Sequence, residues 1–285
     1  MMADWKYISA STVGTSHSRT GTPCQDSSGW QVFTAGDGSQ VLVAVASDGA
    51  GSADRSEEGS ALACSLFLRE MGALFGEEGE GDVRQINREF MNGWLTSFRR
   101  EIELRAEHED LAARDFACTF LAAVVGDDCA VFAQIGDGVI IVPSPEEPEE
   151  FCYVFWPEQG EYANQTYFAT EDGAAGKLQY DLVHRRVDEV AVLTDGLQNL
   201  ALHYQSQTAH TPFFQPVFAW LRPAPDDYSE KFTASLTDYL SSPKVNECTD
   251  DDKTLVLATR RPAAADLSPD ERPPHDQEDD TAAVQ

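Results

Sequence analysis

Aspartate residues stand beside apolar, strand-like segments at four places in this chain. In chain order they are Asp48 after 41–47, Asp137 after 130–135, Asp195 after 190–194, and the cluster 250–252 before 254–259. The ends of neighbouring strands meet at one edge of a sheet, so these acidic side chains can come together there. Carboxylates gathered in one place repel one another unless cations neutralise them, and hard divalent cations prefer oxygen ligands. The pattern therefore indicates a metal site.

An Asp-Gly pair at the end of a strand also has a simpler interpretation, because both residues are common in turns. For Asp48-Gly49 or Asp195-Gly196 taken alone, the turn is the more economical explanation. Four acidic sites, each next to an apolar strand, favour the metal site. Glycine also lets the backbone approach a ligand closely, and its carbonyl oxygen can itself coordinate an ion.

The elements that must position these aspartates are short strands and longer helices. Alternating or short apolar segments predict strands at 5–12, 30–33, 41–47, 119–125, 129–135, 139–142, 190–194 and 254–259. Helical periodicity and capping residues predict helices at 54–75, 83–106, 212–221 and 228–240. Strand pairs lie early and late in the chain, with two helices between them and two near the end. This order favours antiparallel sheets covered by helices over a regular βαβ alternation.

Three segments do not fit regular elements. Residues 14–28 are polar and contain Gly and Pro, which predicts a loop. Residues 143–176 are rich in Pro, Glu, Gly and aromatic side chains, and we interpret them as an irregular excursion whose aromatics need cover. Residues 262–285 consist largely of Pro, Ala, Asp and Glu, which predicts a disordered acidic tail.

The bulk composition argues against several classes of protein. The formal net charge of −29 repels phosphate backbones and anionic membranes, so we expect no nucleic-acid or membrane partner. The charge suits a protein that attracts cations or basic partners, although solubility alone explains it equally well. No CxxC pair, secretory signal or membrane-length apolar segment occurs, which predicts a cytoplasmic protein with reduced cysteines.

Six motifs occur in order along the chain. They are Gly-Thr-Pro-Cys-Gln25-Asp26, Val-Ala-Ser-Asp48-Gly49-Ala-Gly51, Ala-Cys-Thr119-Phe-Leu-Ala, Ile-Gly136-Asp137-Gly138, Leu-Thr-Asp195-Gly196-Leu and Asp251-Asp252-Lys-Thr254-Leu-Val. Their order resembles that of the metal-dependent protein phosphatase 2C family, most closely its compact bacterial branch. The resemblance covers residues 8–260. It implies a catalytic domain at 1–261, in which part of the 143–176 excursion, from 160 to 170, forms a lid.

The resemblance also implies a fold and a site. The fold is α+β, a four-layer αββα sandwich of two antiparallel β-sheets flanked by helices. The resemblance implies two or three Mn²⁺ or Mg²⁺ ions. Asp48 would bridge two of them, the Gly49 carbonyl would bind one of these two, and Asp195 and Asp251 would bind the other. Asp137 would lie near a third ion, and Gln25 and Asp26 would lie in the outer shell. A hydroxide bridging two ions then attacks phosphorus in a phosphoserine or phosphothreonine of a protein substrate, which implies a cognate kinase.

The chain departs from the family pattern at three positions. Gln25 stands where the family often has Glu, so it can reach a metal-bound water but brings no charge. His17 stands where the family usually has an Arg that binds the substrate phosphate, and Arg19 is a candidate substitute. Ala50 stands where larger eukaryotic members carry a His, so the leaving group must take its proton from metal-bound water or from another residue.

Several alternatives remain open at this stage. His17 is as well explained as a loop histidine as by contact with phosphate. Asp251 is chosen over Asp250 and Asp252 because Asp251-Asp252-Lys-Thr254 best fits the family's Asp-Asn-x-Thr pattern. The main functional alternative is a pseudophosphatase that signals by binding metals or phosphoproteins, and a weaker one is a phosphatase of small molecules. The physiological substrate and the oligomeric state do not follow from the sequence.

Overall fold

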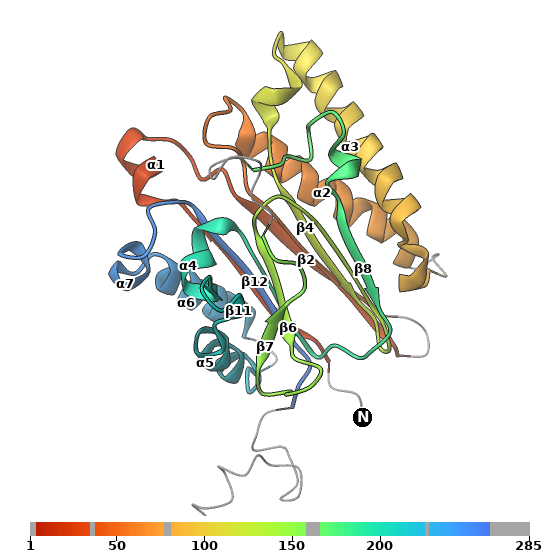
Figure 1. Cartoon of the computed structure of the whole chain (residues 1–285), viewed down its shortest axis with the longest axis vertical. Helices are drawn as coiled ribbons and strands as arrows, with labels where there is room; N and C mark the ends of the chain where they lie inside the picture. Colours follow the sequence, from red (N-terminus) through yellow and green to blue (C-terminus); the bar gives the residue numbers. More distant parts are fainter. Residues whose placement is uncertain (1–3, 35–37, 77–80, 158–165, 226–227, 263–285) are drawn as a thin grey trace, which may run out of the picture.

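Two five-stranded antiparallel sheets lie face to face in the computed structural model, which describes residues 4–34, 38–76, 81–157, 166–225 and 228–262 (Figure 1). One sheet has the order β1 (Lys6–Thr12), β12 (Lys253–Thr259), β9 (Glu189–Leu193), β6 (Val139–Pro143), β7 (Phe151–Tyr153). The other has the order β2 (Ser27–Thr34), β3 (Gln40–Ser47), β4 (Phe120–Val125), β5 (Ala130–Ile135), β8 (Gln179–Val183).

The central strands are largely apolar because both of their faces are buried. In β3, Leu42, Ala44 and Ala46 belong to the core between the two sheets, whereas Val43 and Val45 face the helices on the outer side. Side chains of a strand alternate between the two faces of its sheet. A strand buried on both faces therefore appears in the sequence as a continuous apolar run.

Helices cover the outer face of each sheet. Helices α2 (Ser56–Phe75) and α3 (Arg88–Glu109) pack on the β2–β8 sheet. Helices α5 (Thr211–Leu221) and α6 (Ser229–Leu240), with the short α4 (Gln198–Ala201) and α7 (Pro243–Asn246), cover the other sheet (Figure 1). The predicted four-layer αββα sandwich is therefore confirmed.

The pairing registers bring the functional strand ends to one edge. Leu193 of β9 pairs with Leu255 of β12 and with Val139 of β6. In the other sheet, Ala46 of β3 pairs with Leu121 of β4. The chain therefore leaves β3 and β9, and enters β6 and β12, on the same side of the sandwich.

Several elements differ from expectation. The expected loop at 14–28 contains α1 (Thr15–Thr20), a six-residue helix without buried side chains and so without the apolar periodicity that signals a helix. The expected helix at 83–106 is divided into the 3₁₀ turn Val83–Gln85 and α3, because the Asn87 side chain accepts a hydrogen bond from the Phe90 amide and starts a new helix.

The excursion at 143–176 is partly regular. It contains β7, whose Phe151 ring stacks on Phe218 of α5 with centroids 5.1 Å apart. Part of the expected lid at 160–170 lies outside the described residues. The expected tail lies outside them from residue 263 onward. Three further 3₁₀ turns and a small hairpin were not expected: Ala113–Phe116, Ala174–Gly176, Asp195–Leu197, and β10 (Leu202–His203) paired with β11 (Thr208–Ala209).

Among the described residues, no helix combines the length and the apolar character that crossing a membrane requires. The six cysteines are free.

Candidate metal centre

Three of the predicted aspartates converge at the shared edge of the two sheets. Asp48 follows β3, Asp137 lies in the turn between β5 and β6, and Asp195 follows β9. One carboxylate oxygen from each lies within 4.8 Å of the other two. They come from strands of both sheets, so the sandwich itself, rather than one local turn, creates the cluster.

An open cleft of about 370 Å³ lies over these residues. Its lining consists of Ser16, His17, Asp48, Gly49, Ala50, Gly51, Ser52, Thr166, Phe168, Asp195, Asp250 and Asp251. Asp251 thus shares the cleft with Asp48 and Asp195, and its charge acts on both of them, but it is not one of the three aspartates that form the tight oxygen cluster. The structure therefore groups Asp137 more closely with Asp48 and Asp195 than the sequence indicates.

Threonine side chains fix the backbone of Asp48 and the carboxylate of the nearby Asp26. The Asp48 amide donates to Thr119 Oγ1 at 2.8 Å, and the Thr119 amide donates to the Asp48 carbonyl at 2.8 Å. Thr194 Oγ1 donates to Asp26 Oδ2 at 2.7 Å and accepts from the Thr254 amide at 3.0 Å. The motif positions 119, 194 and 254 thus hold the aspartates in place.

Asp137 is held from three directions. Thr166 Oγ1 donates to Asp137 Oδ2 at 2.6 Å, and the Gln198 side chain donates to the Asp137 carbonyl. Buried Gln134 donates to the carbonyls of Gly136 and Gly138 at 3.2 and 2.9 Å, and Gly136 has a φ of 108° that favours glycine. The turn that carries Asp137 is therefore rigidly built. Sequence analysis missed Thr166, Gln198 and Gln134, which have no spacing that singles them out.

Gly49 is required by close packing. A Cβ at this position would lie 2.7 Å from the carbonyl oxygens of Gln25 and Ser56. Real Cβ atoms essentially never approach backbone oxygens so closely, so only glycine lets the chain turn here beside Asp48.

Burial and mutual repulsion disfavour the charged forms of the clustered carboxyls. Burial, with the charges of Asp26 and Asp195, raises the pKa of Asp48 well above its usual range. Burial, with Asp137 and Asp251, does the same to the pKa of Asp195. Burial also raises the pKa of Asp137, and it raises the pKa of Asp26 to about 6. Like charges forced together in a partly buried site have this effect, and bound cations would reverse it.

The residues fit divalent cations of the Mg²⁺ and Mn²⁺ type. The donor atoms are all oxygens, which hard cations prefer. Asp137 Oδ1 and Asp26 Oδ1 are buried and have no hydrogen-bond partner. Buried polar atoms are otherwise almost always satisfied, so two unpartnered carboxylate oxygens at the cluster are explained by ligands that complete it.

The predicted phosphate-binding residues separate in the structure. His17 lines the cleft, and a Cβ built on Gly51 would lie 3.9 Å from its Nε2. Arg19 does not line the cleft; its side chain is 71% exposed and lies 3.5 Å from the Asp250 carboxylate. Gln25 is buried, and its Oε1 has no partner. Of the two candidates for phosphate contact, only His17 faces the cleft.

For the metal-free protein, we expect Asp48→Asn to raise the melting temperature at pH 7.5 by about 2–4 °C, which corresponds to about 1 kcal/mol. The folded-state pKa of Asp48 lies above the unfolded value of 3.8, so ionising it costs stability, and this cost grows as pH rises from that value. The advantage of the variant should therefore shrink as pH falls toward 5. Thermal unfolding in chelator across pH 5–8 measures it.

The exposed Asp181→Asn variant is the control for the removal of one charge from a protein with a net charge of −29. A variant that is less stable than the wild type at pH 7.5 in chelator, or an advantage that does not depend on pH, would contradict the repulsion argument.

Comparison of the sequence with protein families gives a match to the family model described as protein phosphatase 2C, over residues 13–241. The chain is 37% identical over 254 residues to serine/threonine-protein phosphatase 3 of Escherichia coli (strain K12). The aligned region covers 89% of this chain and 98% of that protein, so the similarity extends over nearly the whole of both.

Solved structures share the fold. The serine/threonine phosphatase of S. agalactiae aligns with a TM-score of 0.57 and 15% identity, over 90% of this chain and 99% of that chain. The catalytic domain of the serine/threonine protein phosphatase PstP, solved with two manganese ions, aligns with a TM-score of 0.55 and 14% identity, over 90% and 97%. At such low identity these structures support the architecture alone.

Proposed function

Since the chain belongs to the protein phosphatase 2C family and is a metal-dependent serine/threonine phosphatase, we propose that Asp48, Asp137, Asp195 and Asp251, with the Gly49 carbonyl, hold its Mn²⁺ or Mg²⁺ ions. The convergence of three carboxylate oxygens within 4.8 Å at the cleft is the observation that carries this proposal. When bound, two or three such ions generate a nucleophile from water at neutral pH and neutralise the phosphoryl oxygens.

The surrounding residues orient the reactants. Asp26, fixed by Thr194, lies next to the cluster and is suited to hold water ligands, and Gln25 offers a buried, unpartnered Oε1 for the same purpose. His17 contributes a nitrogen to the cleft and contacts the substrate phosphate. Arg19 has no part in that contact, because it lies at the exposed side of α1.

The substrate is proposed to be a phosphoprotein. A second cavity, of about 670 Å³, adjoins the cleft and shares Ala50, Ser52 and Phe168 with it. Charged side chains of both signs line this cavity, which suits a polar polypeptide beside the phosphorylated residue; they are Arg99, Arg114, Glu103, Asp115, Glu171 and Asp172. We further propose that a cognate kinase phosphorylates the substrate protein and that the phosphatase acts in the cytoplasm. The net charge of −29 supports the proposal that it has no nucleic-acid or membrane partner.

The expected result is hydrolysis of phosphothreonine and phosphoserine peptides that requires Mn²⁺ or Mg²⁺ and stops with chelator. Phosphate release measures it, and calorimetry of Mn²⁺ binding is the parallel measurement. Ion binding without turnover of any phosphopeptide would favour a phosphoprotein-binding module instead. Faster turnover of a panel of phosphometabolites than of peptides would favour a small-molecule phosphatase.

A further inference from the structure

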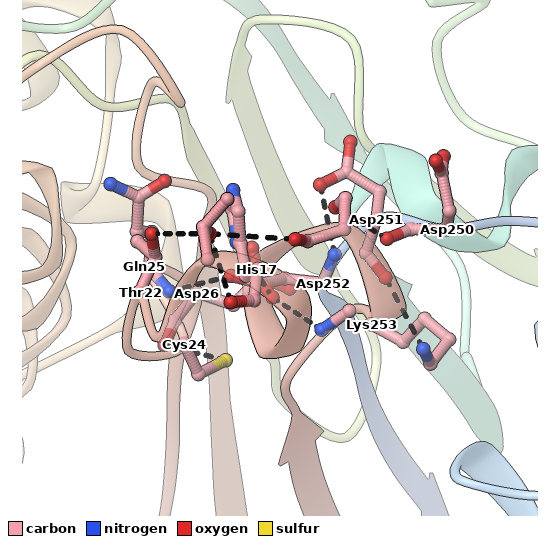
Figure 2. A network of polar contacts seen from close by, with 12 residues as sticks. His17, Thr22, Cys24, Gln25, Asp26, Asp250, Asp251, Asp252 and Lys253 are labelled. Atoms are coloured by element: carbon pink, nitrogen blue, oxygen red, sulfur yellow. Dashed lines mark hydrogen bonds and ion pairs between the residues drawn. The ribbon is translucent and has the colours of Figure 1, made fainter.

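Asp252 is a buried carboxylate that the aspartate cluster does not use. Its side chain is 2% exposed. Its Oδ1 accepts a hydrogen bond from the Gly14 amide at 2.6 Å, and its Oδ2 accepts one from the Gln25 amide at 2.6 Å. Asp252 thus faces the segment around α1, while its neighbour Asp251 lines the cleft (Figure 2). A carboxylate held by two backbone amides can position a neighbouring side chain.

That neighbour is His17. Its Nδ1 is buried and lies 3.0 Å from Asp252 Oδ1, within ion-pair distance but outside hydrogen-bond geometry, and its side chain is only 17% exposed. The other ring nitrogen, Nε2, lies on the side of Gly51, in the glycine-rich loop that follows Asp48 and lines the cleft. A carboxylate this close to Nδ1 favours the ring orientation in which Nδ1 faces Asp252 and Nε2 faces the cleft, and a doubly protonated ring would present its Nε2 proton there.

We propose that His17, positioned by Asp252, donates the proton that the serine or threonine oxygen needs when it leaves phosphorus. The proposal rests on the proposed function. In the step, the attacking water releases one proton to solvent, its oxygen forms a bond to phosphorus, and the ester P–O bond breaks. The electron pair of that bond stays on the ester oxygen, which takes the proton from His17 Nε2. The neutral imidazole then regains a proton from solvent.

The other basic groups nearby do not face the cleft. Lys253 is fully buried, and its Nζ donates to Asn246 Oδ1 at 3.0 Å and to the Asp251 carbonyl at 3.2 Å. Arg19 is paired with Asp250 on the surface. Among the described residues that line the cleft, His17 carries the one basic side chain. Ala50, next to the proposed metal ligand Gly49, has no proton to give.

The experiment compares two substrates with Mn²⁺ present: a phosphothreonine peptide, whose alkoxide leaving group needs a proton, and p-nitrophenyl phosphate, whose leaving group is a weak base. We expect His17→Asn to lower kcat for the peptide about 100-fold, the usual order for the loss of a general acid, and kcat for p-nitrophenyl phosphate less than about threefold. Asp252→Asn should show the same contrast, about tenfold on the peptide. The exposed His184→Asn is the matched control and should leave both rates unchanged.

The outcomes separate this inference from the proposed function. If His17→Asn lowers kcat equally for both substrates and raises KM, His17 only binds phosphate. If kcat for the peptide does not fall, His17 has no role. Either result overturns this inference but leaves the proposed function standing. Weaker Mn²⁺ binding by Asp252→Asn, measured by calorimetry, would overturn the positioning role of Asp252. A wild-type protein that hydrolyses neither substrate would overturn the proposed function and this inference with it. If Asp252→Asn does not fold, His17→Asn decides the question.

Discussion

Asp48→Asn and Asp195→Asn are each expected to lower kcat/KM for a phosphothreonine peptide by at least about 1000-fold with Mn²⁺ present. Each removes one charge from the three-carboxylate cluster and replaces a strong oxygen ligand with a weak one. Metal ions contribute several kcal/mol of transition-state stabilisation, and about 4 kcal/mol corresponds to a 1000-fold change in rate. Steady-state kinetics at several Mn²⁺ concentrations measure the loss.

The same variants should bind Mn²⁺ more weakly in calorimetry while their circular dichroism spectra remain those of the wild type. The matched control is Asp181→Asn, which removes the same charge from an exposed position on β8. Wild-type rates in Asp48→Asn, or a loss of similar size in Asp181→Asn, would show that the cluster does not hold the catalytic metals.

Much of the fold could be predicted from the sequence because burial leaves a clear pattern. Strands β3, β4, β5 and β9 contain segments that are apolar on both faces, and these appear as the continuous apolar runs 41–46, 120–125, 130–133 and 190–193. The elements that were missed have weaker patterns. Helix α1 buries no side chain, and β8 is a partly exposed edge strand whose pattern does not distinguish it from a loop.

The aspartates of the site were found for a similar reason, because each stands directly beside a strand. The groups that position them could not be found in this way. Asp252 is one residue from Asp251, yet it binds the α1 segment, more than 220 positions away in the sequence, and only the tertiary fold assigns the two neighbours to different tasks. Gln134 and Thr166 likewise act through contacts that spacing does not reveal.

Gly196→Ala is the other substitution for which we expect a large effect. A Cβ at position 196 would lie 1.9 Å from the Asp252 carbonyl oxygen, far inside any real contact. Gly196 belongs to the turn that carries Asp195, and Asp252 belongs to the turn that also carries Asp251. Removing the steric clash between them therefore requires the two turns to move apart. A displacement of about 1 Å at an active site costs about 100-fold in rate, and overpacking costs about 1–3 kcal/mol of stability.

We therefore expect Gly196→Ala to lower kcat about 100-fold and the melting temperature by about 2–12 °C. Gly72→Ala is the matched control, because a Cβ there meets no atom within 4 Å and alanine is the better helix former in the last turn of α2. That variant should keep full activity and gain up to about 1 kcal/mol in stability. If Gly196→Ala instead retained wild-type kcat, the separation of the Asp195 and Asp251 turns would not matter for catalysis. The Asp-Gly pair at 195–196 would then be an ordinary turn, and the close packing of glycine against Asp252 would carry no functional constraint.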